Sequence, residues 1–339
     1  MRFSGPLIYY FLEYKDKEGL PLIEVKNLTK HYGEKVALKD ISFSIKQGEI
    51  VGLLGLNGAG KSTTMNILTG YISPSGGSVS IDGYDVLRDS IKAKSVIGYL
   101  PEQFSFYPDM RVTEYLDFAC DLKGYPSGEK RKEHLSKICD KVGITHIRSR
   151  MIRNLSKGYK QRVGFAQALI GNPKVLILDE PTVGLDPSQI IEIRQLIKDS
   201  GHESTVIVSS HILSEIQAIC NRILVIHDGR IVADGSPEEL KHAMQTGNRT
   251  AVRVKGSPEQ IEKALNGIPD LKQITHLPQK ETGTEEYLLI GRKNKDIRED
   301  VFRVLAKADL PLLYTYGSEF SLEDVFLHLT SENKGEKEA

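Results

Sequence analysis

The sequence predicts an α/β fold followed by a smaller α+β domain, and three patterns support this division. The first is a strand, a glycine-rich loop and a helix in direct succession at residues 50–68. The second is a wholly apolar strand at residues 175–178, which is typical of the buried centre of a parallel sheet. The third is a β-α-β-β-α-β order from residue 250 onward, which predicts a small ferredoxin-like sandwich.

The composition excludes several classes of protein. The chain has 339 residues, enough for two domains, with 45 basic and 45 acidic side chains. A net charge of zero gives no indication of a nucleic-acid partner. Cys120, Cys139 and Cys220 show no metal or redox spacing, which favours reduced thiols. Because no apolar run approaches the roughly 20 residues of a membrane helix, any membrane-spanning part is expected in another chain.

The amino-terminal elements lead up to the glycine-rich loop. Residues 1–21 form an extension that is either loosely docked or precedes the true start of translation near Leu20. Strands are predicted at residues 22–25 and within residues 36–45, with Tyr32 in the turn between them. Tyr32 is either a stacking platform for a nucleobase or a half-buried turn tyrosine.

The glycine-rich loop has the spacing of a P-loop. Its backbone N–H groups are expected to close on a phosphate, and the following helix adds the positive end of its dipole. Lys61 supplies a charge for the outer phosphates, and the Ser62 hydroxyl suits Mg²⁺. The flanking strand and helix disfavour the alternative, an ordinary glycine turn. The predicted nucleotide-binding residues here are Gly55, Leu56, Asn57, Gly58, Ala59, Gly60, Lys61, Ser62 and Thr63.

Two more strands, at residues 79–81 and 95–100, precede a polar and mostly helical segment. The second of them ends just before Gln103, whose amide reaches either a metal and its water or only solvent. Residues 104–165 are expected to form a helical insertion between strands of the sheet.

Polar residues then mark two more sites of possible chemistry. Ser156 is a good N-cap, and the helix start at Ser156 and Gly158 is either only a cap or a second anion site. The apolar strand at residues 175–178 ends in Asp179 and Glu180, at the sheet edge where ligands bind. Asp179 suits a Mg²⁺ shell and Glu180 suits polarising an attacking water, whereas a merely structural acidic pair is the alternative.

The rest of the chain completes two domains. A strand at residues 205–210 ends at His211, which either contacts a γ-phosphate or simply starts a helix, and a primed hairpin turn is predicted at residues 228–229. The predicted boundaries are 22–240 for the first domain, 241–249 for a linker, 250–330 for the α+β domain and 331–339 for a disordered tail. The second domain shows no catalytic constellation and is expected to bind, dock or dimerise.

Taken in order, these motifs resemble those of the ATP-binding subunits of ABC transporters, over residues 22–240. Residues 55–63 resemble the Walker A loop, and residues 175–180 resemble Walker B with its catalytic glutamate. Gln103 resembles the Q-loop glutamine, His211 the switch histidine and Tyr32 the adenine-stacking aromatic. The signature motif is matched by Leu155, Ser156, Lys157, Gly158 and Tyr159, and the D-loop by residues 184–187, with Asp186.

The resemblance implies a P-loop NTPase fold of the ABC ATPase type, with an antiparallel β subdomain and with ATP and Mg²⁺ as cofactors. It implies catalytic roles for Glu180, His211 and Gln103, and Mg²⁺ contacts for Ser62, Gln103 and Asp179. Lys157 and Tyr159 depart from the family's common Leu-Ser-Gly-Gly-Gln signature, but Ser156 and Gly158, which would touch phosphate, remain.

The Leu-Ser-Lys-Gly-Tyr form, together with residues 321–326, resembles subunits paired with ABC-2 type exporters. The resemblance implies that two chains pair head to tail, with ATP between the P-loop of one and Ser156 and Gly158 of the other. It implies a peripheral position at the cytoplasmic face of the cell membrane, beside a separate integral membrane permease. A cytosolic ABC-type ATPase with an assembly or regulatory role, without transport, is the alternative.

Overall fold

The structure is a computed structural model that describes residues 21–243, 249–279, 281–292 and 296–318. The chain divides into two compact units, residues 1–237 and 238–339. Residues 1–20 of the predicted amino-terminal extension, most of the linker and the tail lie outside the described residues. So does a last helix, which the sequence predicts at residues 322–329. The finer domain boundaries therefore stay a prediction. Among the described residues, no helix combines the length and apolar character needed to cross a membrane.

The first unit is built on a six-stranded sheet with the order β10-β9-β3-β8-β7-β6. All neighbours run parallel except β10, which is antiparallel to β9. Both β7 and β8 are buried along their whole length, which explains the wholly apolar run predicted as a central strand. The strands are β3 (Ile50–Leu54), β6 (Ile97–Leu100), β7 (Val175–Asp179), β8 (Thr205–Ser210), β9 (Arg222–His227) and β10 (Arg230–Gly235).

The turn between β9 and β10 is of the predicted primed type. Asp228 and Gly229 form it with φ values of 45° and 74°. Positive φ at both central residues matches the right-handed twist of the two strands, which is why the Asp-Gly pair suits this hairpin.

An antiparallel sheet with the order β2-β1-β4-β5 forms the β subdomain that the resemblance implied. Its strands are β1 (Ile23–Tyr32), β2 (Lys35–Ile45), β4 (Gly76–Ile81) and β5 (Tyr84–Asp85). Met65 and Leu68 of α1 (Lys61–Leu68) share one core with Ile23 of this sheet and Ile177 of the parallel sheet. The predicted first strand is too short, because β1 continues to Tyr32, which closes the strand instead of lying in the turn.

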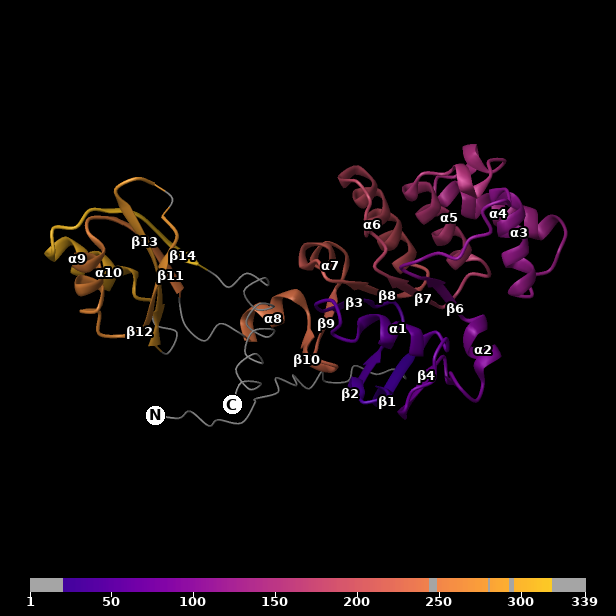
Figure 1. Ribbon diagram of the computed structural model, residues 1–339, viewed down its shortest axis with the longest axis horizontal. Helices are drawn as coiled ribbons and strands as arrows, with labels where there is room; N and C mark the ends of the chain where they lie inside the picture. The colour runs from indigo at the N-terminus through magenta and orange to yellow at the C-terminus, as the bar shows by residue number, and fades with distance from the viewer. Residues whose placement is uncertain (1–20, 244–248, 280, 293–295, 319–339) are drawn as a thin grey trace. The chain divides into compact units, whose positions relative to one another are not determined.

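Three helices, α3 (Val112–Leu122), α4 (Glu129–Lys141) and α5 (Lys157–Leu169), cluster at one end of the first unit (Figure 1). Short 3-10 turns η1 (Thr145–Ile147) and η2 (Ile152–Asn154) join α4 to α5. The other helices of the first unit are α2 (Ser90–Ser95), α6 (Pro187–Gly201) and α7 (Leu213–Ile219), and α8 (Pro237–Ala243) follows at the boundary. The strand predicted from Ser95 begins instead at Ile97, and Ser95 is the last residue of α2. Because Ala93 is the one buried residue of this short helix, its sequence has no apolar repeat that would predict a helix.

The packing of α5 on β6 allows no side chain at Gly98. A Cβ at this position would lie 2.1 Å from the backbone oxygen of Ala168 and 2.9 Å from Pro173. We expect Gly98→Ala to lower the free energy of unfolding by about 3 kcal/mol, because a backbone carbonyl cannot rotate aside as a side chain does. Chemical denaturation measures the change. Gly267→Ala, whose Cβ would lie 3.1 Å from its nearest neighbour, is the milder comparison, and equal effects of the two would contradict the argument.

The second unit has a four-stranded antiparallel sheet with the order β12-β13-β11-β14. Its elements are β11 (Arg249–Lys255), α9 (Pro258–Leu265), β12 (Leu271–Leu277), β13 (Thr284–Gly291), α10 (Arg298–Lys307) and β14 (Leu312–Ser318). Val252 and Tyr287 of the sheet form a buried core with Leu265 of α9 and Leu305 of α10. The six elements follow the predicted β-α-β-β-α-β order, and the ferredoxin-like assignment stays a prediction.

Candidate active site

The candidate site lies at the carboxyl edge of the parallel sheet, where β3, β8 and β7 are neighbours. The P-loop follows β3, Asp179 ends β7, and His211 follows β8, so the topology brings three separate segments to one edge. These segments surround a cavity of about 670 Å³. The cavity is lined by Tyr32, Lys35, Ala37, Asn57, Gly58, Gly60, Lys61, Ser62, Thr63, Glu102, Glu180, Val183 and His211.

The glycines of the P-loop are required by its surroundings. A Cβ at Gly55 would lie 2.5 Å from the backbone oxygen of Ile226, and one at Gly60 would lie 2.8 Å from Leu38. Gly58 lines the cavity with a φ of 83°, which L side chains rarely adopt. The loop therefore keeps its backbone close to the cavity, as a phosphate cradle needs.

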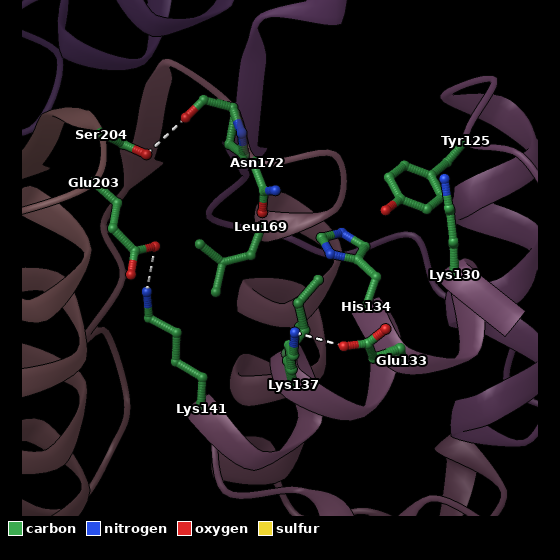
Figure 2. Close-up of a pocket in the computed structure, with 12 residues that line it drawn as sticks. Tyr125, Lys130, Glu133, His134, Lys137, Lys141, Leu169, Asn172, Glu203 and Ser204 are labelled. Atoms are coloured by element: carbon green, nitrogen blue, oxygen red, sulfur yellow. Dashed lines mark hydrogen bonds and ion pairs between the residues drawn. The ribbon is translucent and has the colours of Figure 1, made fainter.

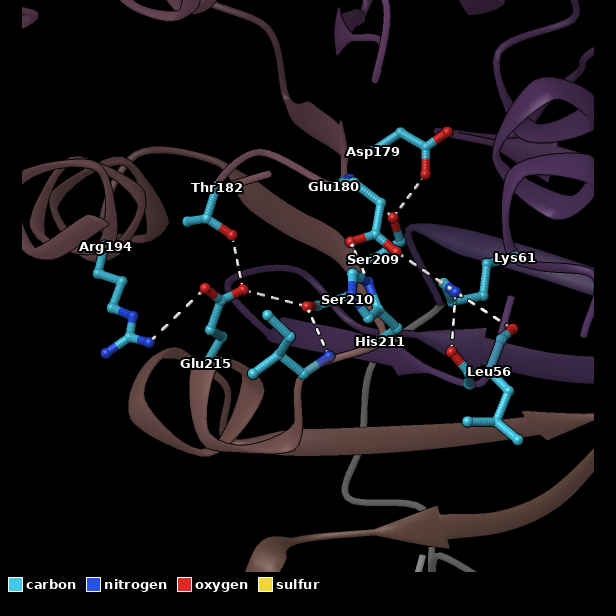
Figure 3. A network of polar contacts seen from close by, with 12 residues as sticks. Leu56, Lys61, Asp179, Glu180, Thr182, Arg194, Ser209, Ser210, His211 and Glu215 are labelled. Atoms are coloured by element: carbon cyan, nitrogen blue, oxygen red, sulfur yellow. Dashed lines mark hydrogen bonds and ion pairs between the residues drawn. The ribbon is translucent and has the colours of Figure 1, made fainter. Parts of the chain in front are cut away.

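Lys61 is held at the base of the loop and is only 5% exposed. Its Nζ donates hydrogen bonds to the backbone oxygens of Gly55, at 2.8 Å, and Leu56, at 3.4 Å (Figure 3). The same atom lies 3.3 Å from Oε1 of Glu180. The ammonium is thus surrounded by oxygen atoms and oriented for an anionic ligand of the loop.

Ser62 forms a hydrogen bond with Asp179, and both were predicted to hold Mg²⁺. Burial raises the pKa of the Asp179 carboxyl, and the negative charge of Glu102 adds to this shift. Hydrogen bonds from Ser209, at 2.5 Å, and from Ser62 lower the pKa and favour the charged form. Among the described residues, no three His, Cys, Asp or Glu side chains form a metal site. A hydroxyl and one carboxylate still fit Mg²⁺, which takes its other ligands from phosphates and water.

Glu180 is placed between two partners at the same edge. Oε2 of Glu180 lies 3.0 Å from Nδ1 of His211, while Oε1 faces Lys61 (Figure 3). The backbone N–H of Glu180 donates to Oγ of Ser209 at 2.9 Å, and its φ is 48°, in the left-handed region. A buried carboxylate held in this way beside the predicted Mg²⁺ ligands is suited to accept a proton from an attacking water.

Tyr32 lies at the mouth of the same cavity. Its side chain is 49% exposed, and Nζ of Lys30 lies 5.1 Å from the centre of its ring. Because this half-exposed ring lines the same cavity as the P-loop, it fits the stacking interpretation, which stays a prediction.

Gln103 is the one predicted catalytic residue that the structure leaves outside the cavity. It is exposed, whereas its neighbour Glu102 lines the cavity. The segment then turns toward the helices, where Phe104 stacks on Phe106 with ring centres 4.7 Å apart. The predicted metal contact of Gln103 is therefore absent from this conformation of the described chain.

The signature residues lie apart from the cavity of their own chain. Oγ of Ser156 accepts a hydrogen bond from the backbone N–H of Tyr159, which confirms Ser156 as the N-cap of α5. Ser156 and Lys157 are exposed, whereas Gly158 is buried against Gln189 of α6. None of the five signature residues, Leu155, Ser156, Lys157, Gly158 and Tyr159, is among the residues that line the cavity.

The D-loop lies beside the signature segment. A Cβ at Gly184 would lie 2.0 Å from Nζ of Lys157, so these two segments are in contact. Asp186 caps α6 by accepting a hydrogen bond from the backbone N–H of Gln189 at 2.9 Å. This predicted D-loop residue therefore fixes the start of a helix that packs against Gly158.

A second cavity, of about 530 Å³, lies between α4 and the loops that follow α5 and α6 (Figure 2). Lys141 forms an ion pair with Glu203 at 2.8 Å. Nε2 of His134 accepts a hydrogen bond from the backbone N–H of Gly171 at 3.0 Å, and burial lowers the pKa of this histidine. A neutral histidine and a lysine that is already paired with Glu203 do not suit a second phosphate site.

One buried acid at the site was missed by the sequence analysis. Glu215 is 4% exposed and accepts hydrogen bonds from Thr182 and Ser210, which lie within two residues of Glu180 and His211. It lies in an ordinary amphipathic helix, α7, with no motif to mark it. Its position four residues after His211 was the one available signal.

Comparisons with known proteins find similar sequences and similar folds. Residues 38–183 match the model of the ABC transporter family. The linearmycin resistance ATP-binding protein LnrL of Bacillus subtilis is 33% identical over 314 residues, which cover 91% of this chain and 98% of that protein. The lipopolysaccharide export system ATP-binding protein LptB of Escherichia coli is 35% identical over 223 residues, covering 64% of this chain and 92% of that protein.

Solved structures show the same fold. The dimeric structure of MJ0796, a bacterial ABC transporter cassette, has a TM-score of 0.58 and 31% identity, and covers 63% of this chain and 98% of its own. A dimeric post-hydrolysis state of the MJ0796 cassette bound to ADP and Pi has a TM-score of 0.58 and 30% identity over the same shares of the two chains.

Proposed function

Since the chain belongs to the ABC transporter ATP-binding proteins, we propose that it powers a separate integral membrane permease of the ABC-2 exporter type. The chain is an ATPase with the cassette fold, and its cofactors are ATP and Mg²⁺. One observation carries the proposal: Glu180 is held between Lys61 and His211, next to the Mg²⁺ ligands, in a cavity lined by the P-loop.

The site residues have distinct proposed roles in hydrolysis. The P-loop N–H groups and Lys61 bind the phosphates and offset their charge. Ser62 and Asp179 hold Mg²⁺, which neutralises charge that develops on the phosphate oxygens. Glu180 orients the attacking water and takes its proton, while His211 fixes the carboxylate and reaches toward the γ-phosphate. Tyr32 stacks on the adenine.

We propose that two ATP-binding subunits pair head to tail across the nucleotide. Ser156 and Lys157 are exposed and lie outside their own chain's cavity, which leaves this surface available to ATP held by another copy. The dimeric form of the MJ0796 cassette supports such a pair. ATP then joins the two subunits, and its hydrolysis releases them.

Export is favoured over import by two relatives. LnrL is named for linearmycin resistance and LptB for lipopolysaccharide export, and both names describe an ATP-binding protein. The Leu-Ser-Lys-Gly-Tyr signature favours the same direction. The proposed location is the cytoplasmic face of the cell membrane, beside the permease, with no nucleic-acid partner.

The test is affinity purification of the tagged full chain from detergent-solubilised membranes of its own organism. We expect one polytopic membrane protein to be recovered in a stoichiometric amount, whereas an untagged strain should yield none. Recovery of soluble partners alone, with the chain missing from the membrane fraction, would reject the transport role. That result would leave the ATPase activity intact and favour a cytosolic assembly or regulatory role.

A further inference from the structure

Glu215 lies at a junction behind the catalytic pair. Its side chain, in the first turn of α7, is 4% exposed. Oε2 accepts a hydrogen bond from Oγ1 of Thr182 at 2.6 Å and another from Oγ of Ser210 at 3.1 Å (Figure 3). One carboxylate oxygen therefore joins the segment after β7 to the last residue of β8.

Both hydroxyl groups belong to the segments that carry the catalytic pair. Thr182 follows Glu180 by two residues, and Ser210 directly precedes His211. Oγ of Ser210 also accepts a hydrogen bond from the backbone N–H of Ile212 at 3.0 Å, which holds the backbone on the far side of the histidine. Glu215 therefore joins the two parts of the chain that bring Glu180 and His211 to within 3.0 Å of each other.

The second oxygen of Glu215 faces α6. Nη2 of Arg194 lies 3.8 Å from Oε1 of Glu215, and Nε of Arg194 is buried with no hydrogen-bond partner in the described part of the chain. An unpaired buried donor is costly. A shorter contact between Arg194 and Glu215 would therefore be favourable. Arg194 belongs to the helix that Asp186 of the D-loop caps.

We propose that Glu215 is a positioning residue for ATP hydrolysis. It holds the segments of Thr182 and Ser210 so that Glu180 and His211 stay paired, and through Arg194 it links this pair to the D-loop helix. The inference rests on the proposed roles of Glu180 and His211 in hydrolysis. Glu215 itself does not line the nucleotide cavity, so it acts only through the residues that do.

A purely structural role for Glu215 would have a different kinetic effect. Loss of a structural contact lowers the amount of folded protein and leaves the turnover of each folded molecule unchanged. Loss of a positioning contact lowers kcat, whereas KM for ATP and nucleotide affinity are spared because the P-loop is untouched. The split between kcat and KM therefore separates the two roles.

The experiment uses the full chain and compares Glu215→Gln with wild type. The amide keeps the size of the side chain but loses the charge that faces Arg194. We expect kcat for Mg-dependent ATP hydrolysis to fall by roughly 10- to 100-fold, since small displacements of catalytic groups have effects of this order. We expect KM and the Kd for a fluorescent ATP analogue to change by less than about twofold.

Two further variants sharpen the result. Arg194→Met should lower kcat, as Glu215→Gln does, without changing KM. Lys198 is an exposed lysine on the same helix, and Lys198→Met should leave kcat unchanged. In a Glu180→Gln background, single-turnover hydrolysis should show no further loss on adding Glu215→Gln, because groups that act as one unit are not additive.

Several outcomes would overturn the proposal. The first is a kcat for Glu215→Gln equal to that of the wild type. The second is an increase in KM and Kd by the same factor as the decrease in kcat. The third is a further loss of single-turnover rate when Glu215→Gln is added to Glu180→Gln. If Glu215→Gln does not fold, Arg194→Met provides the test instead. An unchanged kcat in Arg194→Met would reject the proposed role of the contact between Glu215 and Arg194. A failed permease recovery rejects the transport function alone, because these assays need only the chain, ATP and Mg²⁺.

Discussion

Glu180→Gln is expected to reduce steady-state ATP hydrolysis by roughly 10²- to 10⁴-fold, the range typical of a lost general base. The amide cannot take a proton from water, yet it keeps the size of a side chain that is 6% exposed. Lys61 and the P-loop stay in place, so ATP should still bind. We therefore expect the variant to accumulate as an ATP-dependent dimer, which analytical ultracentrifugation with and without ATP measures.

Glu203→Gln is the matched control for this experiment. Glu203 is exposed and pairs with Lys141 beside the second cavity, away from the P-loop. This variant should hydrolyse ATP at the wild-type rate. If Glu180→Gln hydrolysed ATP at close to the wild-type rate, Glu180 would be rejected as the catalytic base. If this variant did not dimerise in the presence of ATP, the head-to-tail pair would be rejected.

Lys61→Met is expected to weaken ATP affinity by roughly 10- to 100-fold, because hydrogen bonds to charged groups contribute about 1.5–3 kcal/mol each. Methionine keeps the unbranched apolar stem at a site that is 5% exposed, so the loop should stay folded. The ammonium that faces Glu180, and that is predicted to contact the phosphates, is lost. Titration with a fluorescent ATP analogue measures Kd directly, without dependence on turnover.

Lys26→Met provides the comparison for the lysine variant. Lys26 is exposed on β1 and pairs only at the surface with Glu24, at 2.8 Å. Its loss should leave the Kd unchanged. If Lys61→Met bound ATP as tightly as this control, the loop would be a structural turn, which was the alternative interpretation of its glycines.

The parts of the site that could be predicted from sequence are those carried by contiguous residues. The P-loop fixes backbone shape and charge within nine positions, so Lys61 and Ser62 were found without any tertiary information. Asp179 and Glu180 were found because a wholly apolar strand must be central, and the carboxyl ends of parallel strands meet. The element order of the second unit followed from hydrophobic periodicity alone.

The missed features depend on contacts between segments that are distant in sequence. Whether Glu102 or Gln103 enters the cavity depends on how the chain leaves β6, and a shift of one residue exchanges the two. Apart from its position four residues after His211, Glu215 had no signal in the sequence, because its partners come from the segment after β7, the end of β8 and α6. No local pattern in α7 encodes those neighbours.

The left-handed backbone of Glu180 has a consequence for directed evolution of this chain. At a φ of 48°, a residue with a Cβ costs about 1–2 kcal/mol more than glycine does. Removing the Glu180 side chain would leave the buried Lys61 ammonium without this partner, and breaking a buried ion pair costs about 3–5 kcal/mol. The ion pair therefore outweighs the backbone strain. A library selected for heat tolerance alone should retain glutamate over glycine at position 180, which sequencing of the selected library measures.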